Sequence, residues 1–170
     1  MKAKILAIVM VMLLTLGLCG VAAAQQTADI TINIVAPAES ILSFDLNPET
    51  WSPGESAVEL NTIYTSEPFA LKNTGGVAFE ADIRGTDAGG ADADWELSEN
   101  FTNGNMTYGL AFREIPFGDA NPIPEDTVAA LATVNPGIQF DFNLKLKTPT
   151  SITNYSDTLT ATVTITMVAQ

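Results

Sequence analysis

Residues 139–147 have the sequence QFDFNLKLK, and residues 158–170 have the sequence TLTATVTITMVAQ. Apolar and polar side chains alternate in both stretches. Successive side chains of a β-strand point to opposite faces, so each stretch predicts a strand that is buried on one face only. Two long strands of this kind predict an all-β domain whose sheet edges need cover. The apolar positions are Phe140, Phe142, Leu144 and Leu146 in the first stretch, and Leu159, Ala161, Val163, Ile165 and Met167 in the second.

Short alternating stretches separated by Gly, Pro and Asn continue this pattern through most of the preceding chain. Residues 29–35 and 77–84 predict strands, and Asn-Thr-Gly-Gly at 73–76 predicts a hairpin turn. Residues 127–134 are ambiguous between a strand and a helical turn. The expected fold is one antiparallel β-sandwich, jelly-roll or Ig-like, over residues 25–170. We expect its core to include Phe79, Ile83, Leu110, Phe140, Phe142, Leu144, Leu159, Val163 and Ile165.

The N-terminal residues predict a cleaved secretory signal. Lys2 and Lys4 precede an apolar run, residues 5–18, which is too short to span a bilayer comfortably. Three alanines follow at 22–24, and a small-residue ending of this kind marks a cleavage site. We expect cleavage after residue 24, so that residues 25–170 function outside the cell or at its surface.

The residue types exclude several function classes. The chain has no histidine, which removes His-dependent catalytic triads and HExxH zinc sites. Its one cysteine, Cys19, lies in the predicted signal, so the secreted chain would have no disulfide and no thiolate nucleophile. We therefore expect no enzyme, and no cofactor apart from the candidate calcium site described below.

The charge of the chain is strongly negative. There are 20 acidic and seven basic residues, and Lys2 and Lys4 lie in the predicted signal, which leaves a net charge of −15 on residues 25–170. Such a surface repels phosphates and anionic headgroups, so we expect no nucleic acid or membrane partner. Two explanations of the charge stay open: solubility outside the cell or adaptation to salt, and a specific cation-binding role.

The order of turns and strands resembles a known group of surface proteins. The segments are an N-terminal amphipathic strand, SPGE at 52–55, FALKNTGGVAFEADIRGT at 69–86, NPG at 135–137, and the two C-terminal strands. This order is similar to the TasA/camelysin-like biofilm fibre subunits and the archaeal bundling pilins. The resemblance implies a jelly-roll or Ig-like sandwich whose subunits polymerise when an N-terminal strand completes the sheet of the next subunit. Some members were labelled peptidases, which the lack of histidine here does not support.

The segment that matches the polymerising strand is residues 25–35. Ile30, Ile32 and Ile34 lie on one face of this candidate donor strand, where they could fill pockets along an exposed sheet edge. The alternative is that the strand pairs within its own domain. The expected function is a secreted structural subunit that self-assembles into a cell-surface fibre or biofilm matrix, with copies of itself as partners. The open alternatives are a monomeric extracellular module that binds carbohydrate or an adhesion partner, and a surface-layer accessory protein.

Sequons and aromatic residues supply further candidate sites. Asn-X-Ser/Thr sequons beginning at Asn100, Asn105 and Asn154 are candidate N-glycosylation sites in a secreted chain. A planar row of exposed aromatic rings would suit a carbohydrate-binding face, and the alternative is burial in the core or at its ends. The aromatic residues considered are Trp51, Tyr64, Trp95 and Tyr108.

A loop rich in Gly and Asp is a candidate calcium site. Asp87, Asp92 and Asp94 surround Gly89 and Gly90. Ca²⁺ accepts carboxylate oxygens on flexible loops, so these three aspartates are its candidate ligands. Their spacing lacks the EF-hand pattern, and a solvated acidic loop is the alternative.

If these aspartates bind Ca²⁺, millimolar CaCl₂ should raise the melting temperature more than MgCl₂ or NaCl of equal ionic strength, because binding to the native state alone stabilises it. A solvated acidic loop predicts equal, small rises in all three salts, since screening relieves repulsion within the acidic chain. Thermal melts followed by circular dichroism distinguish the two, and equal curves would rule out the calcium site.

Overall fold

The computed structural model describes residues 27–35, 42–53, 57–91, 94–153 and 158–170. These residues form thirteen strands and no helix, so none of them belongs to a helix that is long and apolar enough to cross a membrane. The strands are β1 (Thr27–Val35), β2 (Phe44–Asn47), β3 (Thr50–Trp51), β4 (Ile63–Thr65), β5 (Phe69–Asn73), β6 (Phe79–Arg84), β7 (Ala88–Gly89), β8 (Asp94–Ser98), β9 (Thr107–Glu114), β10 (Asn121–Pro122), β11 (Ala129–Val134), β12 (Gln139–Lys147) and β13 (Thr158–Ala169).

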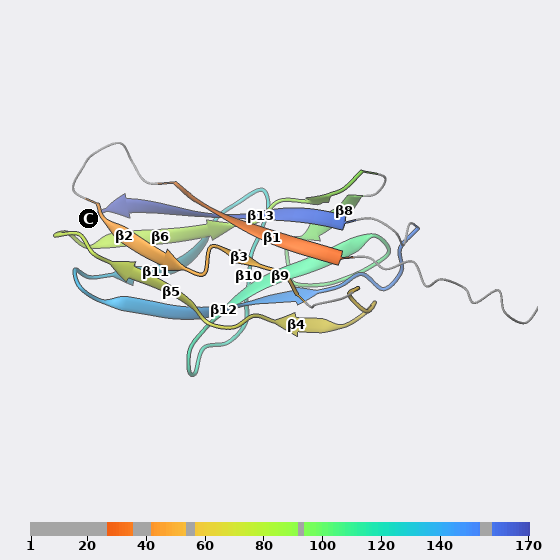
Figure 1. The fold of residues 1–170 in the computed structure, drawn as a ribbon, viewed down its shortest axis with the longest axis horizontal. Coiled ribbons are helices and arrows are strands. Elements are labelled where there is room, and N and C mark those ends of the chain that lie inside the picture. Colours follow the sequence, from red (N-terminus) through yellow and green to blue (C-terminus); the bar gives the residue numbers. More distant parts are fainter. Residues whose placement is uncertain (1–26, 36–41, 54–56, 92–93, 154–157) are drawn as a thin grey trace, which may run out of the picture.

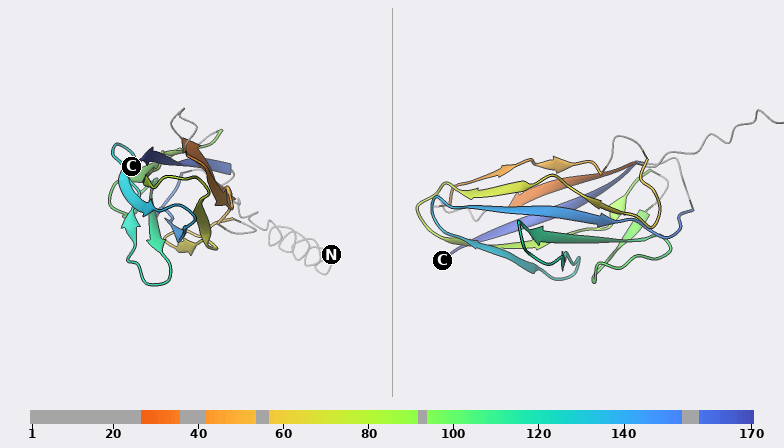
Figure 2. Two further views of the ribbon diagram at one scale, coloured as in Figure 1. Left: turned by 90° about the vertical axis from the view of Figure 1, so that its left-hand side faces the viewer. Right: turned by 90° about the horizontal axis from the view of Figure 1, so that it is seen from below.

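The thirteen strands form one mixed sheet that curls around the core (Figures 1 and 2). Its main path is β11-β6-β13-β7-β8-β9-β12-β5-β2, so the short β7–β8 pair connects the half that contains β13 to the half that contains β12. The prediction of an all-β domain is confirmed. The prediction of a purely antiparallel sandwich is wrong in strand direction, because β1 runs parallel to β13 and β8 runs parallel to β9. The whole domain connects β1 to β13, as is typical of parallel neighbours, whereas only residues 99–106 connect β8 to β9.

Strands β12 and β13 supply the centre of the core. The alternation predicted for β13 is confirmed, with Val163 and Ile165 fully buried and its threonines exposed or half-buried on the outer face; in β12 the apolar positions from Phe142 to Leu146 are buried as predicted, but the polar-face residue Asn143 is buried too. Phe140 was expected in the core but is only half-buried, because it lies at the start of β12 and stacks on Phe142 with ring centroids 5.9 Å apart. The other predicted core residues, Phe79, Ile83, Leu110, Phe142 and Leu159, are buried.

The Asn-Thr-Gly-Gly turn does not form the predicted hairpin. β5, before the turn, pairs with β2 and β12, whereas β6, after it, pairs with β11 and β13. The turn therefore carries the chain from one half of the sheet to the other. Asn73 stabilises this crossing: its buried Nδ2 donates to the carbonyl oxygens of Val77 at 2.8 Å and Val134 at 2.9 Å, and its Oδ1 accepts from the Gly75 N–H at 2.9 Å.

The ambiguous segment 127–134 contains a strand, β11, which forms one end of the sheet path. β11 pairs with β6 and has a bulge between Ala130 and Ala132. β2 forms the other end, and β3, β4 and β10 are further strands of two or three residues at the margins. Short strands and bulges are common ways to keep sheet edges from pairing with other chains.

Replacement of Val163 by aspartate should unfold the domain. Val163 is fully buried, and an unpaired buried carboxylate costs several kcal/mol, comparable with the roughly 5–15 kcal/mol that stabilises a domain. Thr164→Asp is the matched control, because Thr164 is half-buried on the outer face and lies opposite Arg84 of β6. Chemical denaturation measures both variants. A near-native Val163→Asp protein would contradict the register of β13.

Candidate functional site

The candidate donor strand, β1, lies in its own domain in this structure. It pairs with β13 in parallel over nine residues, from Thr27 opposite Thr158 to Val35 opposite Thr166. Ile30 and Ile32 belong to the core and are only 2% and 7% exposed. The third candidate anchor, Ile34, stands opposite Ile165 in the same register, and its side chain lies outside the described residues. The sequence left open whether this strand pairs within its own domain or with another subunit. In the single chain, β1 pairs within its own domain.

The other edge of β1 has much less pairing. β3 pairs with β1 at two positions, Ile30 opposite Trp51 and Thr31 opposite Thr50. One further backbone hydrogen bond runs from the Ile32 N–H to the Glu49 carbonyl at 3.2 Å. Within the described chain, β1 is therefore attached mainly through β13, along one edge and through two inward isoleucines.

Carboxylates gather beside the buried Tyr108, at the β8 end of the molecule. The Tyr108 hydroxyl donates to the Thr86 carbonyl, and burial raises the pKa of Tyr108, with the Asp87 charge adding to the rise. Burial also raises the pKa of Glu125, and the neighbouring Asp87 carboxylate raises it further. Asp87 and Glu125 are 38 positions apart in sequence, so this like-charge pair is formed only by the fold.

Two acidic side chains at this end accept hydrogen bonds from backbone N–H groups. Asp87 Oδ1 accepts from the Leu97 N–H at 2.6 Å, which fixes the loop before β7 against β8. Glu99 Oε1 accepts from the N–H groups of Glu125 and Asp126 at 2.8 and 3.1 Å. Charged acceptors make the stronger hydrogen bonds of a protein, so these carboxylates order the loops around Tyr108.

The candidate calcium ligands divide between described and undescribed residues. Asp87 is engaged with β8, Asp94 is exposed at the start of β8, and Asp92 lies outside the described residues. Among the residues that the structure describes, no group of three or more Asp, Glu, His or Cys side chains is arranged to hold a metal ion. The calcium site therefore stays a prediction from sequence.

Two of the three sequons fall on described residues. Asn100 is exposed in the turn after β8. Asn105 is also exposed, but its Oδ1 accepts from the Ser151 hydroxyl at 2.9 Å. Asn154 lies outside the described residues. Asn100 is accordingly the sequon whose side chain is more accessible, and glycosylation stays a prediction.

The four aromatic residues do not share one surface. Trp95 and Tyr108 are each 1% exposed and contact each other in the core, with ring centroids 6.1 Å apart. Trp51 and Tyr64 are half-buried and line a shallow groove between β3 and β4. We call this the Trp51–Tyr64 groove; it has a volume of about 440 Å³, and its lining includes Pro48, Trp51, Pro53, Tyr64, Thr65 and Glu67.

Most of the basic residues lie on one outer face, which the sequence alone did not reveal. In β12, Lys145 and Lys147 are half-buried and stand opposite Thr65 and Ile63 of β4. Arg113 of β9 stands opposite Asn143, and its Nε is buried without a hydrogen-bond partner. Among the described residues, no carboxylate lies within 4.0 Å of these cations. The outer cations of this half of the sheet are Lys72, Arg113, Lys145 and Lys147.

Comparison with known proteins gives no relative from which a function could be transferred. No family model matches the chain, and no curated protein matches it. The function must therefore be argued from the geometry of β1, the groove and the charged faces.

Glu125→Gln should change the pH dependence of stability. A carboxyl group whose pKa is raised by folding favours the native state below its unfolded pKa, near 4.3, and this contribution is lost as pH rises through the folded pKa. The variant should therefore be more stable than wild type at pH 7, by less than about 1 kcal/mol because Glu125 is partly exposed. Thermal melts from pH 4 to 8 measure this, with exposed Glu96→Gln as the control. A parallel pH profile for Glu125→Gln and wild type would contradict the raised pKa of Glu125.

Proposed function

We propose that this protein is a secreted structural subunit that assembles with copies of itself into a cell-surface fibre or matrix by exchange of β1. The observation that carries the proposal is the attachment of β1: two core isoleucines and a nine-residue ladder with β13 on one edge, against two paired positions with β3 on the other. A strand held in this way can be supplied by another copy without loss of contacts.

Exchange would replace every contact by an identical one. The β1 strand of a second copy offers the same isoleucines and the same main-chain donors and acceptors to β13. Exchange of an identical element between protomers is a low-cost route to association for that reason. In a chain cleaved after residue 24, β1 would be a terminal strand, and a terminal strand can leave its domain without breaking another connection.

The curled sheet suits this mechanism. Its two halves, around β12 and β13, contribute buried side chains to one core, and a jelly-roll or Ig-like sandwich is the finer architecture that we propose. Loss of β1 would leave a slot beside β13 with two apolar sites and an unpaired edge. Such an edge recruits an extended strand through main-chain hydrogen bonds, and its pockets select the side chains.

Composition supports an extracellular place of action. The predicted signal directs the chain to secretion, and the net charge of −15 after cleavage keeps it soluble and away from nucleic acid and anionic membranes. The partner expected under this proposal is a second copy of the chain.

The second candidate function is a monomeric binding module. The Trp51–Tyr64 groove is the observation that favours it, because two half-buried aromatic rings beside a carboxylate could contact a sugar. Negative-stain electron microscopy of the purified protein separates the two functions. Filaments support the structural subunit, and dispersed particles support the binding module.

A disulfide between β1 and β13 should block filament formation by strand exchange. Thr31 and Thr162 are in-register neighbours on the outer face, and adjacent strands lie about 4.8 Å apart, within the Cα range of a disulfide. We expect Thr31→Cys/Thr162→Cys, in a Cys19→Ser background, to form no filaments when oxidised, at a protein concentration at which it does form filaments when reduced. Sedimentation and microscopy compare the two states of the same protein.

Filaments of the oxidised protein that match those of the reduced protein would overturn strand exchange. Asn33→Cys/Thr164→Cys is a second lock on the same pair of strands. A lock is a sharper test than deletion of residues 25–35, because deletion also removes Ile30 and Ile32 from the core and destabilises the domain.

A further inference from the structure

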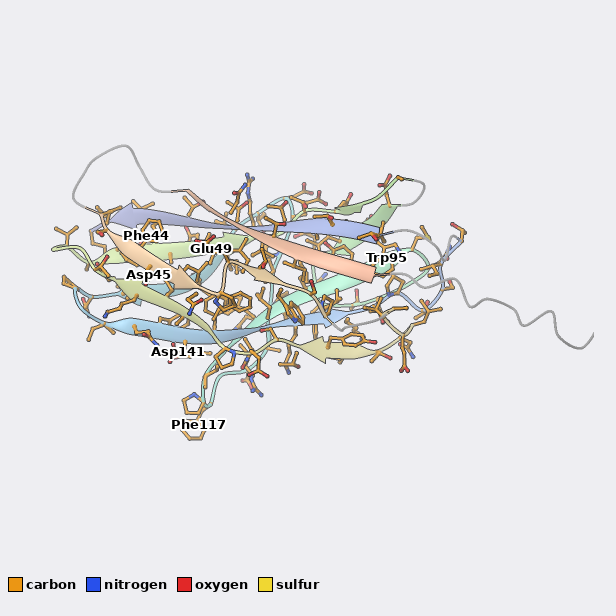
Figure 3. All side chains as sticks on the ribbon, viewed as in Figure 1. Phe44, Asp45, Glu49, Trp95, Phe117 and Asp141 are labelled. Atoms are coloured by element: carbon orange, nitrogen blue, oxygen red, sulfur yellow. The ribbon has the colours of Figure 1, made fainter. Side chains whose placement is uncertain are left out.

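Phe117 projects from the domain on an ordered loop. It lies between β9 and β10, is 94% exposed, and points away from the sheet (Figure 3). The loop is held at its base by the Gly118 N–H, which donates to the Glu114 carbonyl at 3.0 Å, and by the Ile115 N–H, which donates to the Asp141 carbonyl of β12 at 3.0 Å. The structure thus presents a large apolar side chain to water on a fixed support.

The Trp51–Tyr64 groove is suited to receive such a side chain. Its volume of about 440 Å³ exceeds the roughly 150 Å³ of an apolar cavity that holds a benzene ring. Two prolines, Trp51, Tyr64 and Phe69 contribute to its lining, so an aromatic ring would find apolar and aromatic contacts there. Phe117 of the same chain does not occupy the groove, because its side chain is almost fully exposed.

Charge determines which partner fits and how it is oriented. Lys145 stands opposite Thr65, which lines the groove, and Lys147 stands opposite Ile63 of the same strand. Neither lysine has an ion-pair partner among the described residues. The loop that carries Phe117 contains the exposed Asp119, and exposed Glu114 ends β9 directly before it. A second copy of this chain therefore offers both the apolar side chain and the opposite charge.

We propose that Phe117 of one copy inserts into the Trp51–Tyr64 groove of a second copy, with Asp119 placed beside Lys145 of that copy. Glu67 lies on the groove as well, so the acidic loop must approach from the β12 side, where the lysines are. The inserted residue and the groove are different surface patches, which makes the contact heterologous. A heterologous contact that does not close into a ring propagates into an open chain of subunits.

This contact is a second interface between copies, beyond strand exchange and independent of it. The oxidised Thr31→Cys/Thr162→Cys protein therefore tests it separately, because its β1 is locked. Trp51 is the reporter: the chain has two tryptophans, and Trp95 is buried in the core, so only Trp51 emission should respond to filling of the groove. Sedimentation velocity and tryptophan emission are measured together over a concentration series.

We expect the locked protein to associate with rising concentration while its tryptophan emission shifts to shorter wavelength. Phe117→Ala should raise the dissociation constant at least about tenfold, as truncation of a central aromatic anchor does, and remove the shift. Val128→Ala is the matched control, because Val128 is 54% exposed at another site and its loss should change neither reading. A locked protein that stays monomeric with constant emission, or a Phe117→Ala variant that associates like its parent, would overturn the proposal.

A charge exchange tests the orientation. Lys145→Glu should weaken association of the locked protein, because it places a carboxylate beside the incoming Asp119. Lys145→Glu combined with Asp119→Lys restores an opposite pair across each contact and should recover the affinity. A double variant as weak as the single one would contradict the proposed approach from the β12 side. Strand exchange is blocked in all of these locked proteins. The tests of the two interfaces are therefore independent: either the filaments that depend on β1 or the Phe117 contact can fail while the other holds.

Discussion

The inward row of β13 is the interaction on which the rest of the structure depends. Its five side chains, Leu159 to Met167, are at most 3% exposed, and the strand is paired along both edges. One edge carries β1 over nine positions, and the other carries β6 over six. The register with β13 determines which side chains of β1 and β6 face the core. These are Ile30 and Ile32 in β1 and Ile83 in β6. A shift of β13 by one residue would turn all of these contacts to the wrong face.

The part of the fold that follows a period of two could be predicted from sequence. The alternation over residues 139–147 and 158–168 is long, and the apolar positions that it predicts to be inward, such as Leu144 and Val163, are buried in the structure. The pattern fails at Phe140, where the strand begins, and at Asn143, which was placed on the polar face. Asn143 is buried because its Nδ2 donates to the Ser66 carbonyl at 2.7 Å, a partner 77 positions away.

The turns show why topology was harder to predict than strands. Asn and Gly favour tight turns because they tolerate positive φ, but none of residues 73–76 has positive φ in the structure, so the hairpin turn that this preference predicts does not form. At Asn73, which ends β5, the chain instead crosses to the other half of the sheet, since its side chain bonds to the carbonyls of Val77, before β6, and Val134, at the end of β11, in that half. Strand direction could not be predicted from the sequence either, because alternation of apolar and polar residues is the same in a parallel and an antiparallel strand.

The candidate sites depended even more on contacts between distant residues. The isoleucines of residues 25–35 were visible as a row, whereas their place beside β13 required the register. Asp87 meets Glu125, and Lys145 meets Thr65, only through pairing between strands far apart in sequence. The Trp51–Tyr64 groove combines β3 of one half of the sheet with β4 of the other, so no local pattern marks it.

The net charge constrains how copies of this chain can meet. If the signal is cleaved after residue 24, two chains of charge −15 repel each other, and the Debye length of about 10 Å at 0.1 M salt sets how far that repulsion reaches. Strand exchange repeats contacts that already exist within one chain and adds no new charge pair, so screening of the overall repulsion favours it. A contact through Asp119 and Lys145 gains from an attraction that salt weakens, while the burial of Phe117 is not screened. The two proposed interfaces should therefore respond differently to ionic strength, because burial of Phe117 would stabilise the second one even where its ion pair is screened.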